Sequence, residues 1–403
     1  MTLEFEKLTP ELEQMALSIS ERYRQRHERM GTFQRTLERF AGDWAAVDEA
    51  LARSAARADK KFYRSARPLD DVEPLNAAIS PSEVPSQATI IATDGSQIMP
   101  DRHAAFLYYL INVGGIIYYH GEDDPPAVFT SPQIAYLDDM QLDDEFGLSS
   151  SQISIERDLE EIGMLAEMIW AFREALQPLL GLVDQRLLYW PIGGGGAASG
   201  RAVDTWCRRM TEIRQFGGLL AGYIDRPGKV SVVTLLQALG AGDNFDWKLL
   251  GKRESIQGTT DVHLFREILG LGQRSRVFID ISPANERFAE VDPANQVCFF
   301  YLNPGQWGQQ IARVDIPMWV AQDRAAVAAV HALVIDQCQI IGDYPYALTR
   351  ADEMAVVGRR DQEELDFMIE LAMQRHGIEG TLTAKQGSKE LARGGKTRHK
   401  SIG

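Results

Sequence analysis

The stretch Ala88-Thr89-Ile90-Ile91-Ala92-Thr93-Asp94-Gly95-Ser96 decides the fold that we expect for this chain. Its first six residues form a short apolar run that predicts a buried strand, and Asp94 then opens a turn. Apolar, aromatic-rich runs follow at 104–113 and 116–120, separated by Gly114-Gly115. A Gly-Gly pair between two such runs predicts a β-hairpin. The segment therefore predicts a carboxylate at the tip of a buried strand, next to a hairpin.

The composition is typical of a globular protein that works in a reducing compartment. The chain has 403 residues, of which 45% are hydrophobic and 25% charged, so it can bury a substantial core. The sequence has no apolar run of about 18 residues, the length of a membrane span, and its first residues do not resemble a secretory signal. Three cysteines (Cys207, Cys298 and Cys338) lie far apart, without the spacing of a metal site. We therefore expect a cytoplasmic protein.

The formal net charge of −15 limits the kinds of nucleic-acid binding that are plausible. A protein that coats nucleic acid needs an excess of Lys and Arg to bind phosphates, so that class is disfavoured. A nuclease remains possible, because DNA can enter a local basic channel while metal ions on carboxylates supply further positive charge.

The composition along the chain predicts four regions. Residues 1–66 form an N-terminal helical arm, in which Gly31 suggests a break between two helices. This arm is either a lid on the core or a docking element for a partner or a second copy. Residues 67–87 form a linker rich in Pro, Ser and Asp, residues 88–378 form the main domain, and residues 379–403 form a disordered basic tail.

The order of elements in the main domain predicts a mixed α/β sheet. After the hairpin we expect a helix over 154–177, a strand over 186–190, a helix over 201–216 and a strand over 219–225. Parallel strands joined by helices, next to an antiparallel hairpin, have the order of a ribonuclease H-like sheet flanked by helices. Sites in such sheets form where the carboxyl ends of neighbouring strands diverge, and Asp94 would lie there.

Later segments of the sequence add a set of ordered motifs. With the segment around Asp94, the motifs are Asp94-Gly95-Ser96; Arg157 with Glu161; Thr260-Asp261 with Leu264-Phe265 and Gly272-Gln273-Arg274-Ser275; Phe299-Phe300-Tyr301; Asp315-Ile316-Pro317 with Trp319; and Tyr344-Pro345 with Leu348 and Ala351. In this order they resemble the NurA family of DNA-repair nucleases, the partners of the hexameric translocase HerA, over about residues 88–376.

The resemblance implies a nuclease that depends on Mn²⁺ or Mg²⁺. Such an enzyme resects DNA ends as a 5′–3′ exonuclease and cuts single strands as an endonuclease, and it acts as a homodimer docked on a HerA-type ATPase. Asp94, Glu161 and Asp261 match the catalytic metal-binding acids, and Asp352 stands as a further ligand where many members have His. Hard cations of this kind prefer oxygen ligands, and they could activate water and neutralise the scissile phosphate.

Other interpretations of these residues stay open at this point. Asp94 could be only a turn former, Asp261 a helix cap, and Asp352 a helix-start residue; Glu160 is the alternative to Glu161. Arg102, Arg274 and Arg276 are candidates for contacts with DNA phosphates or for structural ion pairs. The glycines at 193–196 lack the Gly-Lys-Ser/Thr ending of a P-loop, so ATP hydrolysis would come from a partner.

One departure from the family pattern concerns the fourth strand. Many members end it with Asp-Gly, whereas this chain has Tyr189-Trp190-Pro191-Ile192 at the place we assign to it. Asp184 and Asp225 are near in sequence, but neither lies at the expected strand tip. The departure suggests an alternative function, an inactive NurA-like adaptor that regulates a HerA-type ATPase. A phosphatase on the same fold is a third possibility that no residue specifically favours.

Overall fold

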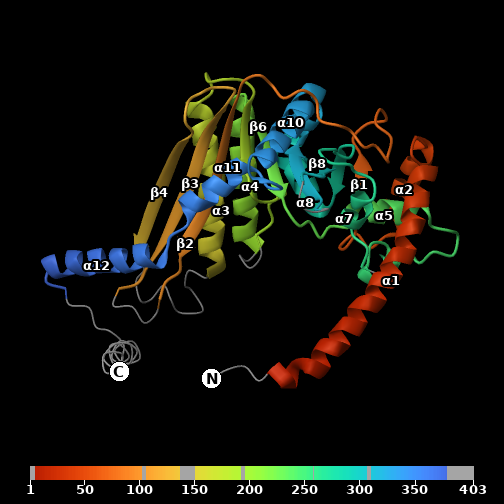
Figure 1. Cartoon of the computed structure of the whole chain (residues 1–403), viewed down its shortest axis with the longest axis horizontal. Coiled ribbons are helices and arrows are strands. Elements are labelled where there is room, and N and C mark those ends of the chain that lie inside the picture. The colour runs from red at the N-terminus through yellow and green to blue at the C-terminus, as the bar shows by residue number, and fades with distance from the viewer. Residues whose placement is uncertain are drawn as a thin grey trace.

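The computed structural model describes residues 5–101, 106–136, 150–191, 196–256, 258–305 and 310–378. Within these ranges the strands form one nine-stranded sheet in the order β1-β7-β8-β9-β6-β5-β2-β3-β4, with helices packed on both faces (Figure 1). The basic tail predicted for 379–403, and Arg102, lie outside the described residues.

Five strands at one end of the sheet carry the predicted fold. Strands β2 (Ala88–Ile98), β3 (Tyr108–His120) and β4 (Ala127–Tyr136) are antiparallel neighbours, and β5 (Leu179–Val183) and β6 (Leu219–Ile224) run parallel to β2. The order β4-β3-β2-β5-β6 is that of a ribonuclease H-like sheet, so the expected fold class is confirmed. The sheet continues through β9 (Ala312–Pro317), β8 (Val297–Leu302), β7 (Phe278–Ile281) and β1 (Ser65–Pro68), all antiparallel.

Alternate residues of β2 point to opposite faces of the sheet, as the period of a strand requires. Ile91 packs with helices α3 (Ser150–Ala171) and α4 (Gly196–Gln215), whereas Ile90 and Ala92 pack with α10 (Arg324–Ile341) and α11 (Tyr346–Ala355). Length and composition alone would let α10 cross a membrane, but half of its residues are packed inside the protein.

The N-terminal arm is anchored at only one end. Helix α1 (Thr9–Arg39) runs unbroken through Gly31, and α2 (Trp44–Arg57) follows it, so the predicted break at Gly31 is wrong. Met30, Phe33 and Leu37 of α1 are buried against α5 (Ser231–Leu239) and its neighbours, whereas the first half of α1 extends away from the body (Figure 1). Packing of the last turns stabilises the helix across a glycine that costs only about 1 kcal/mol.

The remaining elements connect these layers or cover their edges. They are η1 (Phe5–Leu8), η3 (Trp247–Leu249), α6 (Arg253–Ile256), α7 (Asp261–Arg266), α8 (Pro283–Val291), η4 (Pro293–Asn295), α9 (Met318–Ala321) and α12 (Arg359–Arg375). Strand β1 falls partly within the segment predicted as a linker.

Gly114 and Gly115 lie inside strand β3, so the predicted Gly-Gly turn is wrong. The two strands of the real hairpin are β2 and β3, and their connection lies between Ile98 and Tyr108. The glycines serve close packing instead. A Cβ on Gly114 would lie 2.2 Å from the backbone nitrogen of Ala355, and one on Gly115 would lie 2.3 Å from the ring of Phe129.

The strand predicted at 186–190 is also wrong, because the chain forms β5 seven residues earlier, at Leu179–Val183. The later residues form an irregular segment in which Leu187, Leu188 and Tyr189 are buried, whereas Trp190 is 51% exposed. The ring of Tyr189 stacks on Trp206 of α4 with centroids 4.6 Å apart. Burial therefore explains their hydrophobicity without a strand. This shift moves the strand tip to a different residue.

Candidate metal centre

Asp94 and Asp184 are brought together by the parallel pair of strands β2 and β5. The last paired residues are Thr93 and Val183, and each is followed by an aspartate. The fourth-strand acid that we expected to be missing is therefore Asp184. Asp94 itself does not end its strand: β2 continues to Ile98, and Asp94 pairs with Gly114 of β3.

Glu161 approaches the two aspartates from α3. Its side chain is only 4% exposed, its Oε1 accepts a hydrogen bond from Gln185 Nε2 at 3.1 Å, and its backbone oxygen accepts one from Thr93 Oγ1 at 3.2 Å. The carboxylate lies beside Gly95, where a Cβ would be in ordinary contact with Glu161 Oε2 at 3.5 Å. Glu160, the alternative, instead accepts a hydrogen bond from Gln133 of β4 at 3.0 Å.

Arg157 lies one turn before Glu161 and is also close to the strand. A Cβ on Gly95 would lie 2.9 Å from Arg157 Cγ. The guanidinium donates two hydrogen bonds to Oδ1 of Asp158, at 3.2 and 2.5 Å. The carboxylates of Asp158, Glu161 and Asp94 raise the pKa of Arg157 although burial opposes this. A permanent cation therefore lies beside the acids.

Asp352 joins the group from α11, and Tyr344 precedes that helix. Asp352 lies close enough to Asp94 for its carboxylate to raise the pKa of Asp94. Tyr344 lies beside Asp184, and burial together with the carboxylates of Asp184, Asp94 and Asp225 raises the pKa of its phenol. Asp225 follows β6 and lies at the edge of the group.

The acids of this cluster are held in a field that disfavours their ionised forms. Burial, with Asp352 and Asp184 nearby, raises the pKa of Asp94 to about 6. Burial and the charge of Asp94 raise the pKa of Glu161 well above its ordinary value, and burial together with Asp225 and Asp352 raises the pKa of Asp184. Desolvation and the neighbouring negative charges both favour the protonated forms of these acids. A bound cation would favour the ionised forms instead.

The carboxylates of this cluster are the kind of ligand that binds a hard divalent cation. Mg²⁺ and Mn²⁺ prefer carboxylate oxygens and need few of them. Within the described ranges, however, no three His, Cys, Asp or Glu side chains are arranged closely enough to hold one ion. Oδ1 of Asp94 accepts a hydrogen bond from the N–H of Gly95, and Oε1 of Glu161 accepts one from Gln185, so ligation of one ion by three of the acids requires side chains to turn.

Asp261 does not join this cluster, contrary to the expectation from sequence. It is entirely buried at the start of α7. Its Oδ1 accepts a hydrogen bond from the N–H of Val233 at 2.9 Å, and its Oδ2 accepts from the N–H of Val232 at 3.1 Å and from the hydroxyl of Tyr301 at 2.7 Å. The carboxylate thus caps the N-terminus of α5, with both of its oxygens in hydrogen bonds and no exposure to solvent.

Two of the arginines proposed for DNA contact are in the interior, which corrects that expectation. Arg274 is 7% exposed and forms an ion pair with Glu73 at 2.9 Å. Arg276 is fully buried; it donates hydrogen bonds to the backbone oxygens of Glu73 and Asp70 and lies over the ring of Trp44. Both fasten the segment before β2 to the sheet.

Sequence reasoning missed Asp184, Gln185 and Tyr344 as members of the site. A signal for Asp184 was available: the apolar run Leu179–Val183 is bounded by Pro178 and by the acid itself, which is the pattern of a short buried strand. Tyr344 belongs to one of the motifs noted above, but a tyrosine before a helix has no local signature of a site.

Comparisons with known proteins identify the family of the chain. The model of the NurA domain matches residues 88–357, a range that contains Asp94, Glu161, Asp184 and Asp352. The chain belongs to the NurA family. The family model leaves out α1 and α2, so the N-terminal arm of this NurA protein lies outside the part matched. A comparison with curated proteins finds no match.

Several solved structures are similar to the chain at low sequence identity. The NurA nuclease from Sulfolobus solfataricus is 14% identical, with a TM-score of 0.44, over 74% of this chain and 87% of that chain. A NurA bound to dAMP and manganese is 11% identical, with a TM-score of 0.32, over 70% and 88%. The catalytic domain of human endonuclease V is 13% identical, with a TM-score of 0.32, over 82% and 98%.

Proposed function

We propose that this NurA-family protein is a nuclease that hydrolyses DNA phosphodiester bonds with a divalent cation, Mn²⁺ or Mg²⁺. The observation that carries the proposal is the cluster of Asp94, Asp184, Glu161 and Asp352 beside the inner strands β2 and β5. The pKa values of Asp94, Glu161 and Asp184 are raised. Four acids from separate segments, gathered beside one another, are costly unless a cation binds there. The nuclease activity implied by the family resemblance is the chemistry that such a cation serves.

Each residue of the cluster has a proposed role. Asp94, Asp184, Glu161 and Asp352 would hold the cation, which would activate water and neutralise charge on the scissile phosphate. Arg157 would bind a phosphate oxygen, because its cation is fixed beside Glu161. Tyr344 would orient Asp184, because its hydroxyl lies beside that carboxylate, so that one carboxylate oxygen stays directed to the ion.

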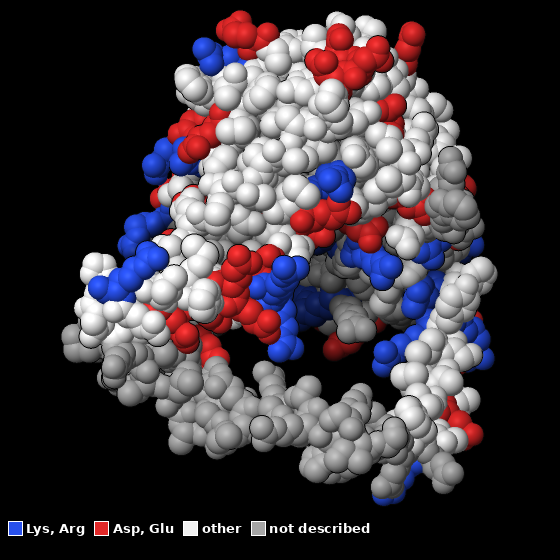
Figure 2. Space-filling model, turned by 60° about the vertical axis from the view of Figure 1, so that its left-hand side comes forward, with Lys and Arg blue, Asp and Glu red and all other residues white. Residues whose placement is uncertain are grey.

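The overall negative charge of the chain is compatible with DNA binding. Figure 2 shows acidic and basic side chains interspersed on one face, and both Lys or Arg and Asp or Glu side chains lie beside a recess in it. A DNA strand could therefore approach along the basic side chains and avoid the acidic ones.

The inactive adaptor is the weaker alternative. Its reason was the acid expected to be missing at the fourth strand, and Asp184 follows Val183 at the end of that strand. We therefore favour an enzyme over an adaptor. A HerA-type ATPase remains the partner that the family resemblance implies, together with DNA end resection, 5′–3′ polarity and a cytoplasmic location.

Dimerisation, also implied by the resemblance, is supported by the arm. The first half of α1 exposes apolar side chains three or four residues apart, which lie on one face of a helix. Leu12, Met15 and Ile19 are each 53% exposed. We propose that this stripe packs against a second copy. Light scattering would test this: a Leu12→Glu, Ile19→Glu variant should be monomeric where the wild type is dimeric.

Cleavage of labelled single-stranded DNA tests the proposed activity. We expect the wild type to cleave with Mn²⁺ or Mg²⁺, and EDTA to abolish cleavage. Asp184→Asn and Glu161→Gln should each lower the rate at least about a hundredfold, since a missing ligand weakens the cation site and its charge stabilisation. Glu160→Gln is the matched control on the same helix and should retain activity. Full activity of Asp184→Asn would refute the assignment.

A further inference from the structure

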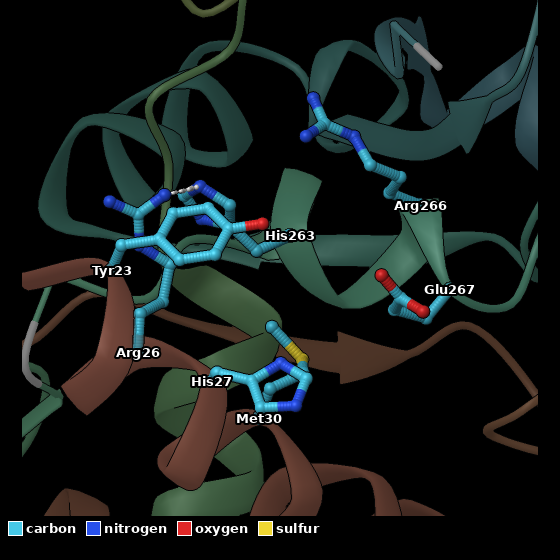
Figure 3. Close-up of a pocket in the computed structure, with 7 residues that line it drawn as sticks. All are labelled: Tyr23, Arg26, His27, Met30, His263, Arg266 and Glu267. Carbon is cyan, nitrogen blue, oxygen red and sulfur yellow. Dashed lines mark hydrogen bonds between the residues drawn. The ribbon is translucent and has the colours of Figure 1, made fainter. Parts of the chain in front are cut away.

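A hollow lies between α1 and α7, away from the acid cluster, and opens to solvent. The arm contributes Tyr23, Arg26 and His27, and α7 with the residue after it contributes His263, Arg266 and Glu267 (Figure 3). Helix α7 lies towards the end of the sheet that carries β1, whereas the acids lie beside β2 and β5 (Figure 1).

Arg26 lies against the ring of His263, with its Nη1 2.6 Å from Nε2. Arginine can only donate. The other ring nitrogen, Nδ1, accepts a hydrogen bond from the backbone N–H of Thr260 at 3.1 Å and lies 2.8 Å from Oγ1 of the same residue. A neutral imidazole has one acceptor nitrogen, so His263 cannot satisfy both donors. Burial and the charges of Arg26 and Arg266 lower the pKa of His263 to about 4, in agreement with a neutral ring in a positive field.

The positive charge of Arg26 is not compensated by an acid. Among the described residues, no carboxylate forms an ion pair with it, and its Nε is shielded from solvent without a hydrogen-bond acceptor. A guanidinium that is partly removed from water without an anionic partner is unfavourable. Glu267 also lines the hollow, but Figure 3 shows it on the α7 side, across from Tyr23 and Arg26. An anion would meet Arg26 from the arm side.

Tyr23 adds an aromatic surface at the same place. It is 67% exposed, and the guanidinium of Arg26 lies 5.9 Å from the centre of its ring. A cation beside an exposed aromatic ring is the combination by which proteins hold a single strand, with a phosphate on the cation and a base stacked on the ring.

We propose that this hollow binds one nucleotide unit of single-stranded DNA, with its phosphate on Arg26 and its base on Tyr23. The choice of DNA as the ligand rests on the proposed nuclease function. The site would hold the strand at a distance from the acids and guide it towards them. Because the arm lies outside the family-matched residues 88–357, this contact would be a property of this chain's arm.

Binding of a fluorescein-labelled oligothymidylate to the full chain in EDTA tests the proposal, since no cleavage occurs there. Arg26→Gln should lower the affinity about tenfold, the effect of one charged contact, and should reduce the salt dependence of log K by about 0.7. Tyr23→Ala should lower the affinity about tenfold and Tyr23→Phe by less than about twofold. The control is Arg24→Gln, which removes the same charge from the opposite side of α1, where Arg24 is 71% exposed.

The outcomes separate this inference from the proposed function. Equal affinities for Arg26→Gln and Arg24→Gln would overturn the second site, and so would a wild type that does not bind the oligonucleotide. Cleavage by the wild type that is lost in Asp184→Asn would leave the nuclease function standing in that case. Conversely, weaker binding by Arg26→Gln alone supports the site even if no cleavage is detected. Thermal unfolding of each variant verifies that it is folded.

Discussion

Asp261→Asn should destabilise the protein without impairing catalysis, and this separates the two acids that sequence analysis placed in one site. The substitution keeps the shape of the side chain but replaces one acceptor oxygen by a donor. With the amide nitrogen at the Oδ1 position, the buried N–H of Val233, now 2.9 Å from that oxygen, loses its acceptor. The N–H of Val232 and the hydroxyl of Tyr301 keep theirs.

The expected cost is about 2 kcal/mol of unfolding free energy. One buried donor without an acceptor costs about 1–3 kcal/mol. A negative charge at a helix N-terminus is worth about 0.3–1 kcal/mol, but burial already raises the pKa of Asp261 to about 6, so the ionised form brings little net gain. Urea denaturation at pH 7 measures the difference. Cleavage of single-stranded DNA by the folded variant should proceed at the wild-type rate.

Asp94→Asn is the matched control and should behave in the opposite way. Burial, Asp352 and Asp184 raise the pKa of Asp94 to about 6, so a neutral amide relieves repulsion at pH 7. We expect unchanged or greater stability, with cleavage lowered at least about a hundredfold. An Asp261→Asn protein as stable as the wild type but unable to cleave DNA would refute the reasoning, because the carboxylate would then act in catalysis and not as a cap.

Three further predictions follow from the same contacts. Because the pKa of Asp94 is raised from 3.8 to about 6, its carboxyl group is protonated at pH 5, and the metal-free fold loses stability as the pH rises through 6. Mn²⁺ should therefore raise the melting temperature more at pH 8 than at pH 5. Equal shifts at the two pH values would contradict this. Gly114→Ala should cost about 3 kcal/mol or more and abolish cleavage, since its Cβ would lie 2.2 Å from the backbone nitrogen of Ala355; a folded, active variant in urea and cleavage assays would count against it. Arg276→Ala should cost about 3 kcal/mol by breaking buried bonds to Glu73 and Asp70, yet leave oligonucleotide affinity unchanged when measured by anisotropy.

Local patterns predicted the residues whose neighbours in sequence determine their place. The apolar run before Asp94 forms β2, and the spacing along 154–177 predicts most of α3 and with it the position of Glu161. The error at the fourth strand arose because two short apolar runs compete there. Both are buried, and only pairing with β2 and β6 selects Leu179–Val183 as the strand. Pairing of this kind depends on distant residues and has no local signal.

Asp261 illustrates a different limit. The pair Thr260-Asp261 was correctly recognised as a possible helix start, and Asp261 does begin α7. Its carboxylate, however, bonds to the first N–H groups of α5, about thirty residues earlier in the chain. When the helix that an acid caps lies so far away in the sequence, nothing in the neighbouring residues distinguishes the cap from a metal ligand. The glycines of β3 mislead for the same reason, since their partners Ala355 and Phe129 come from other elements.

The acid cluster depends on how α11 is attached to the sheet. The carbonyl of Ala355, at the end of that helix, accepts hydrogen bonds from Ser96 Oγ at 2.5 Å and from Asn112 Nδ2 at 2.8 Å. These neutral bonds join the end of the helix to β2 and β3, and Gly114 allows the close approach. The repulsion between Asp352 and Asp94 is therefore offset by contacts that involve no charge. Because these contacts involve no cation, the fold can form first and hold the carboxylates together for the metal ion that we propose.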